Sequence, residues 1–205
     1  MATQQAGQGQ VLTEVLAPDV RPWRWTTGEF QQLGEEGRFA GRRVMLIEGE
    51  ILEREMTSNP DHFTAVELAQ AELRASFGVG FVVRAQGPFD IGRSTDPEPD
   101  LAVVRGGPRD FAQAHPTQAV LIVEVSSATL RYDQNEKSSL YASVAVPEYA
   151  ILNIRARQIE VRREPVQDAA QRFGWRYSSL QVLAPEERWA PLHAINSVLV
   201  RDLLP

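Results

Sequence analysis

Two long stretches of the chain carry apolar residues at helical spacing. Asn59 can cap the first stretch through its side-chain oxygen, and Pro60 suits the first turn of a helix. The apolar positions that share one helical face are Val66, Ala69, Leu73 and Phe77. Gly78 and Gly80 follow, and glycine is typical of helix ends. The pattern predicts a helix over residues 60–77.

The second stretch lies in the middle of the chain, where Thr129 offers a helix cap and Pro147 a helix end. The residues with the spacing of one helical face are Lys137, Leu140, Tyr141 and Val144. A shorter helix, capped by Thr26 or Thr27, is predicted near the N-terminus through Leu33.

Short apolar runs bounded by turn residues predict the strands. These runs are 44–47, 51–56, 81–83, 101–104, 119–123, 149–154, 158–163 and 176–183. The first two flank Glu48-Gly49 and predict an N-terminal hairpin. The run 119–123 is apolar on both faces, as expected of a strand inside a sheet. The order of the elements predicts an α/β or α+β fold, with one mixed β-sheet flanked by helices.

The length of 205 residues suits one folded domain, which we expect over residues 21–205. Residues 1–20 are polar and rich in Gln and Gly, and we expect a mobile tail there. No apolar run approaches the ~18 residues of a membrane-spanning helix, and the first ten residues lack the features of a signal peptide. We therefore expect a cytoplasmic protein without a membrane partner.

Composition limits the chemistry. The chain has no cysteine, which excludes disulfides, thiolate zinc sites and a cysteine nucleophile, so oxygen or histidine must hold any metal. The 21 basic and 27 acidic residues give a formal charge of −6, which argues against nucleic-acid binding by bulk charge alone. Lys137 is the single lysine, whereas all other basic residues are arginine. A compact ammonium differs from a guanidinium where a point charge is needed, so its position matters.

Two carboxylates occur where burial is expected. Asp100 begins an apolar strand, and Glu124 lies at the end of the most apolar strand, between Val123 and Val125. A buried carboxylate must be paired, hydrogen-bonded or metal-bound. If the two strands are antiparallel neighbours, both carboxylates meet at the same end of the sheet. Such a pair suits a hard divalent cation, Mg²⁺ or Mn²⁺.

Lys137 is predicted on the core-facing side of its helix, with its ammonium directed toward the carboxylates. A structural explanation remains open for each residue. Asp133 and Lys137 have the spacing of a helical ion pair, Asp100 can cap a turn, and Glu124 can reach solvent from a strand end.

The remaining candidates carry weaker signals. His62 shares a helical face with apolar residues, where histidine is more often a packing or capping residue. Glu48 and Glu50 in the hairpin are expected to be solvated, and so are His115 and His193 in loops. The chain has no glycine-rich phosphate loop, no H-E-x-x-H and no G-x-S-x-G, so nucleotide hydrolysis, zincin and α/β-hydrolase chemistry have no support.

Four short motifs occur in order with suitable spacing between about residues 40 and 165. They are Pro99-Asp100, Glu124-Val125-Ser126, the stretch from Asp133 through Glu136-Lys137 to Tyr141, and Val146-Pro147-Glu148-Tyr149. With these motifs the chain resembles the Uma-two family of restriction-endonuclease-like proteins in the PD-(D/E)XK nuclease superfamily. It departs from the superfamily pattern at Ser126, where the lysine normally lies; the resemblance implies that Lys137 replaces it.

The resemblance implies a Mg²⁺-dependent site that cleaves DNA phosphodiester bonds. Asp100 and Glu124 would bind the metal, Lys137 would orient the attacking water or stabilise the phosphorane, and His62, which matches a histidine of the family, would support the site. Arginines are expected around the cleft to offset the negative charge, namely Arg84, Arg93, Arg105 and Arg109. A homodimer stays open, since nucleases of the superfamily are often dimers.

Two other functions stay open at this point. The first is a non-catalytic interaction or regulatory module, in which the Asp, Glu and Lys side chains form a buried salt-bridge network. The second is a metal-dependent hydrolase of a substrate other than DNA.

Overall fold

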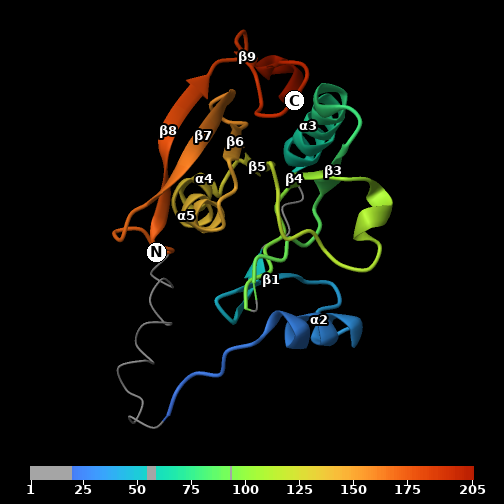
Figure 1. Cartoon of the computed structure of the whole chain (residues 1–205), viewed down its shortest axis with the longest axis vertical. Helices are drawn as coiled ribbons and strands as arrows, with labels where there is room; N and C mark the ends of the chain where they lie inside the picture. The colour runs from blue at the N-terminus through green and yellow to red at the C-terminus, as the bar shows by residue number, and fades with distance from the viewer. Residues whose placement is uncertain (1–19, 55–58, 93) are drawn as a thin grey trace.

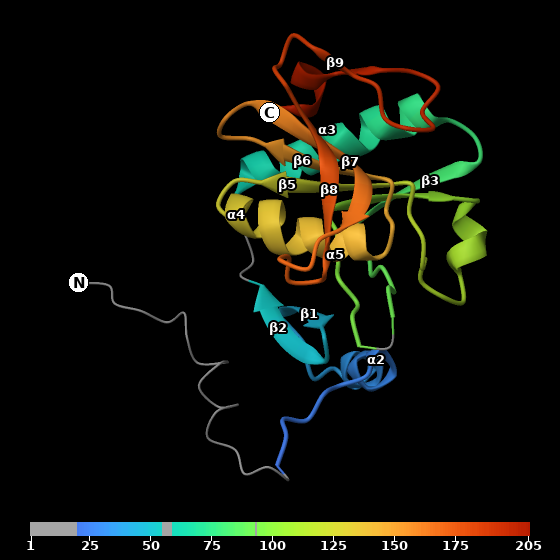
Figure 2. The same ribbon diagram turned by 60° about the vertical axis from the view of Figure 1, so that its left-hand side comes forward.

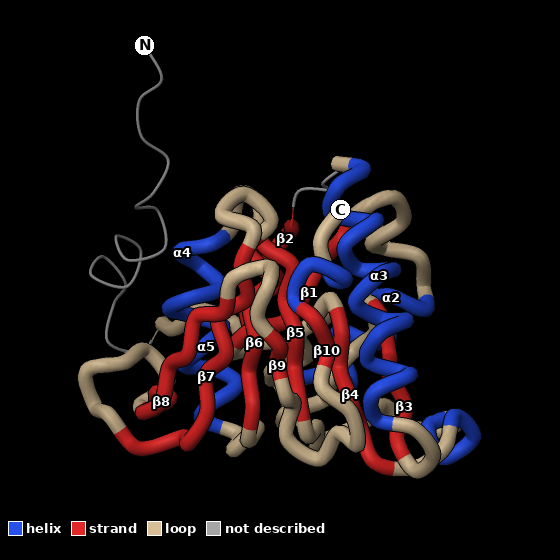
Figure 3. The backbone as a smooth tube through the Cα atoms, turned by 90° about the horizontal axis from the view of Figure 1, so that it is seen from above, coloured by secondary structure: helices blue, strands red, loops and turns tan. Residues whose placement is uncertain are grey.

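The structure is a computed structural model that describes residues 20–54, 59–92 and 94–205 (Figure 1), so the predicted tail lies outside it except for its last residue. Its centre is a six-stranded sheet in the order β3-β4-β5-β6-β7-β8 (Figure 3). The strands are β3 (Phe81–Ala85), β4 (Leu101–Arg105), β5 (Leu121–Ser126), β6 (Glu148–Asn153), β7 (Gln158–Gln167) and β8 (Trp175–Leu183). Neighbouring strands are antiparallel except β5 and β6, which run parallel. The predicted mixed sheet is confirmed.

One face of the sheet is covered by α3 (Pro60–Phe77) and by the C-terminal segment (Figure 2). Asn59 caps α3 by accepting a hydrogen bond from the next but one backbone N–H, and Gly78 ends the helix at φ 69°. The predicted helix bounds are therefore confirmed. The C-terminal segment contains β9 (Arg188–Trp189), β10 (Val198–Leu199) and the 3₁₀ turn η3 (Val200–Leu203).

The other face is covered by one interrupted helix (Figure 2). It consists of α4 (Leu130–Tyr132), the π-helical turn η2 (Asp133–Lys137) and α5 (Ser138–Ser143). The sequence predicts a helix here but not the π turn, which widens the helix where Lys137 lies. Such turns are frequent at functional sites. A further 3₁₀ turn, η1 (Pro108–Phe111), follows β4.

The predicted N-terminal hairpin is present as β1 (Arg43–Ile47) and β2 (Glu50–Arg54). Its turn residues, Glu48 and Gly49, both have positive φ, as a tight two-residue hairpin turn requires. The sequence extends the second strand to residue 56, which lies outside the described residues. The hairpin packs on α5 through a small apolar cluster, next to α2 (Thr27–Glu35), which Thr26 caps as predicted.

No helix in the described ranges is both long and apolar enough to cross a lipid bilayer.

Glu148 at the start of β6 anchors three segments of the chain. It is fully buried, and its carboxylate accepts hydrogen bonds from the Arg163 guanidinium at 2.8 Å and the Trp189 indole at 2.9 Å. The backbone N–H of Leu192 donates to the same carboxylate at 2.5 Å. Glu148 thereby connects β6 to β7 and to the C-terminal segment.

Glu148→Ala is expected to lower the free energy of unfolding by ~2–4 kcal/mol, because it leaves the buried Trp189 indole and the Leu192 N–H without their acceptor. The half-buried Arg163 guanidinium loses its ion pair but keeps the Ala190 carbonyl as an acceptor. Urea denaturation measures this. Glu186→Ala, at an exposed position, is the control and should stay within ~0.5 kcal/mol of the parent protein. Equal stability of the two variants would refute the anchoring role.

Candidate functional site

The antiparallel pairing of β4 and β5 brings Asp100 and Glu124 together. Leu101 pairs with Val123, so the start of β4 lies beside the end of β5, as the sequence predicts. Each carboxylate contacts the backbone of the other strand. The N–H of Asp100 donates to Glu124 Oε2 at 3.4 Å, and the N–H of Val125 donates to Asp100 Oδ2 at 2.9 Å. Both side chains are fully buried.

Lys137 reaches the same end of the sheet from η2, which covers the face of the sheet opposite to α3. Its Nζ lies 2.8 Å from Glu124 Oε2 and 3.2 Å from Asp133 Oδ1. Asp133 is itself held by the Thr129 hydroxyl, which donates to Oδ2 at 2.7 Å. Lys137 is 5% exposed, so its ammonium is almost removed from solvent and lies between two buried carboxylates.

His62 approaches from the first turn of α3. Its ring is buried, and Nε2 lies 3.5 Å from Asp100 Oδ1. The structure thus brings together Asp100, Glu124, Lys137 and His62, from two strands and two helices on opposite faces of the sheet.

Tyr141 completes the group, although the sequence indicates only a core position for it. Its hydroxyl donates to Glu124 Oε1 at 2.9 Å, so both oxygens of that carboxylate are engaged. Burial, and then the nearby charge of Glu124, raises the pKa of Tyr141 well above its ordinary range. The hydroxyl therefore stays protonated and stays a donor. The signal for this contact is the spacing of four residues from Lys137, which places both side chains on one helical face.

Three buried phenols make the stability of the folded chain depend on pH. Burial raises the pKa of Tyr141, Tyr149 and Tyr177 above the ordinary value of about 10. Above that pH the unfolded chain releases these protons and the folded chain keeps them, so stability must fall as pH rises. Each phenol contributes a slope of ~1.4 kcal/mol per pH unit.

Urea denaturation at several pH values above ~10 gives the slope of the free energy of unfolding against pH. This slope is expected to be less steep by ~1.4 kcal/mol per pH unit in Tyr141→Phe, and by the same amount in Tyr177→Phe. Below that pH these phenols add no slope. An unchanged slope in both variants would contradict the assignment.

The profile of the Uma2 family, described as "Putative restriction endonuclease", matches residues 27–201. The chain belongs to the Uma2 family. A crystal structure of a "putative nuclease" from Anabaena variabilis ATCC 29413 has the same fold, with a TM-score of 0.62 and 14% sequence identity. The match covers 87% of this chain and 96% of that one. No curated protein matches the sequence.

The donor set at this end of the sheet fits a divalent metal. Asp100 and Glu124 offer hard oxygen ligands from rigid strands, held by backbone N–H groups. Within the described part of the chain, no group of three or more His, Asp or Glu side chains is arranged to hold a metal by itself. The two carboxylates would therefore share the ion with water and substrate oxygens, which is the usual coordination of Mg²⁺.

The weaker candidates are exposed at the surface. Glu48 and Glu50 are exposed and form ion pairs with arginines on the surface. His115 and His193 are exposed in loops, as predicted.

The arginines expected around the cleft require a correction. Arg105 ends β4, about 17 Å along the strand from Asp100, and Arg109 follows it in η1. Both lie toward the end of the sheet opposite to Asp100. The prediction was wrong for these two arginines because proximity in sequence to a site strand does not fix which end of the strand a residue occupies. Arg84, in contrast, pairs with Ala102 near the Asp100 end of the sheet, and its guanidinium packs over the Phe111 ring. Arg93 lies outside the described residues.

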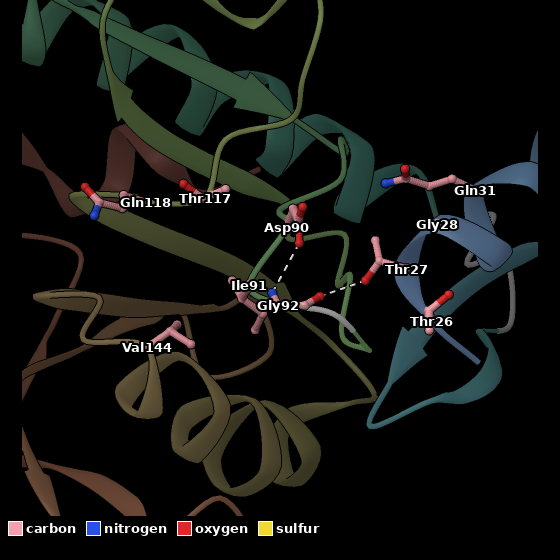
Figure 4. Close-up of a pocket in the computed structure, with 10 residues that line it drawn as sticks. All are labelled: Thr26, Thr27, Gly28, Gln31, Asp90, Ile91, Gly92, Thr117, Gln118 and Val144. Atoms are coloured by element: carbon pink, nitrogen blue, oxygen red, sulfur yellow. Dashed lines mark hydrogen bonds between the residues drawn. The ribbon is translucent and has the colours of Figure 1, made fainter. Parts of the chain in front are cut away.

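A hollow of about 720 Å³ lies between α2, the loop after β3 and the end of α5 (Figure 4). The Thr27 hydroxyl on one side donates to the carbonyl of Gly92 on the other at 2.7 Å. None of the four predicted site residues lines this hollow. A second hollow lies at the ends of β5 and β6.

Proposed function

We propose that this Uma2 protein is a Mg²⁺-dependent endonuclease that hydrolyses DNA phosphodiester bonds. The observation that carries the proposal is the meeting of Asp100, Glu124 and Lys137 at one end of the sheet. Family membership supports nuclease chemistry in general, and the two carboxylates support a metal in particular.

Asp100 and Glu124 would hold the ion, Mg²⁺ or Mn²⁺. When bound, such an ion supplies Lewis acidity and lowers the pKa of a coordinated water. The contribution of the protein is to fix both carboxylates before the ion arrives. Backbone N–H groups hold one oxygen of each carboxylate, and the Tyr141 hydroxyl holds the second oxygen of Glu124.

Lys137 would orient the attacking water and oppose the negative charge that develops on the phosphoryl oxygens. Its two carboxylate partners hold the ammonium in place. His62 would act through Asp100, because its ring nitrogen contacts that carboxylate and thereby limits its orientation. His62 is therefore a positioning residue.

A second candidate function is favoured by burial. Asp100 and Glu124 are fully buried, and Lys137 bridges Glu124 and Asp133. These contacts also suit a structural network in a non-catalytic interaction module.

Two measurements on the purified protein decide between the candidates. Thermal unfolding with and without Mg²⁺ tests for the ion, since a ligand that binds the folded state stabilises it. Incubation with supercoiled plasmid and with single-stranded DNA tests the substrate. Stabilisation together with Mg²⁺-dependent cleavage supports the endonuclease. Stabilisation without cleavage indicates a metal-dependent hydrolase of another substrate, and unchanged melting indicates the structural module.

A further inference from the structure

The end of the sheet that carries the candidate site also carries a basic hollow of about 760 Å³. It is formed by the loop after β5, the start of α4 and the loop after β6. Because β5 and β6 are parallel and Ser126 pairs with Asn153, both loops leave the same end of the sheet. Glu124 precedes the first of these loops, so the hollow adjoins the site.

Its lining carries charge of one sign. Arg131 and Arg155 are the charged residues that line the hollow, and no carboxylate does. Both arginines are exposed, and neither forms an ion pair with a carboxylate of the described residues. In a chain with a net charge of −6, such a hollow is a local concentration of positive charge.

Tyr132 connects the hollow to the site. Tyr132 lines the hollow, and Lys137 Nζ lies 6.0 Å from the centroid of its ring. The same Nζ lies 2.8 Å from Glu124. Asn153 also lines the hollow, and its side-chain oxygen accepts a hydrogen bond from the Ala156 N–H.

We propose that this hollow binds backbone phosphates of the nucleic-acid strand next to the bond that is cleaved, through Arg131 and Arg155. The inference rests on the proposed function, whose substrate it places. Guanidinium groups suit phosphate because their planar array of donors matches its oxygens. The hollow thus takes the place of the cationic surface that the sequence assigns to Arg105 and Arg109.

The test compares Arg131→Gln/Arg155→Gln with the parent protein. A short fluorescein-labelled DNA duplex is titrated in EDTA, where no cleavage occurs, and fluorescence anisotropy gives the affinity over a range of salt concentrations. The double variant is expected to bind about tenfold more weakly. Its slope of log K against log salt should be smaller by about one for each arginine. Two duplexes of unrelated sequence should be weakened equally, because phosphate contacts carry no base information.

The matched control is Arg105→Gln/Arg109→Gln, at the other end of the sheet, which should bind as the parent does. The single variants Arg131→Gln and Arg155→Gln, each with about half the change in slope, provide a second measurement if the double variant folds poorly. Parental affinity and slope in the Arg131/Arg155 variants of a protein that cleaves DNA would overturn the inference alone. A parent that binds no DNA would overturn the proposed function as well.

Discussion

Glu124→Gln is expected to reduce Mg²⁺-dependent DNA cleavage by ~10²–10³-fold while the protein remains folded. Glutamine has the shape of glutamate; its oxygen can accept from the Lys137 ammonium while its amide donates to the Tyr141 hydroxyl oxygen, but it lacks the negative charge that would hold the ion. Initial rates of plasmid nicking measure the loss. Asp100→Asn should lose activity to a similar extent, because the two carboxylates act on one ion.

The matched control is Glu186→Gln, an exposed position where the same chemical change should leave the rate unchanged. Thermal unfolding of all three variants shows whether they are folded. Parental nicking rates in folded Glu124→Gln would remove Glu124 from the catalytic site.

Lys137→Met is expected to lower the free energy of unfolding by ~3–5 kcal/mol and to abolish cleavage. The substitution keeps the length of the side chain but leaves Glu124 and Asp133 buried without the ammonium between them. Urea denaturation without metal measures the loss of stability. The exposed Arg38, paired with Glu36, provides the control, and Arg38→Met should cost less than ~1 kcal/mol.

Adding Asp133→Asn to Lys137→Met removes one of the stranded charges and should restore part of the lost stability. A double-mutant cycle measures this coupling. Strict additivity of the two substitutions, or a stability of Lys137→Met equal to that of the parent, would show that the ammonium does not stabilise the cluster.

The parts of the fold that the sequence predicts well depend on local signals. The helix at 60–77 has its cap, its apolar face and its terminal glycine within one stretch, so both ends could be placed. The meeting of Asp100 and Glu124 could be predicted as well. It requires only that two apolar strands adjacent in sequence pair in antiparallel fashion, which is the common arrangement.

What escapes the sequence depends on contacts between distant segments. Glu148 is part of a recognisable motif, but its role follows from a tryptophan and a backbone N–H more than 40 residues away. The π turn at Asp133–Lys137 has no signature in the apolar pattern. Arg131 and Arg155 line one hollow because parallel strands place two separate loops at one end of the sheet.

The central claim is that Asp100 and Glu124 together bind a divalent cation, and a Mn²⁺ titration followed by electron paramagnetic resonance tests it most directly. Free Mn²⁺ gives the signal, so bound ions are counted as signal lost. The parent protein should show a saturable site that is absent from Asp100→Asn and Glu124→Gln but retained in Glu186→Gln. Equal Mn²⁺ binding by the parent and both carboxylate variants, or none by the folded parent, would contradict the account.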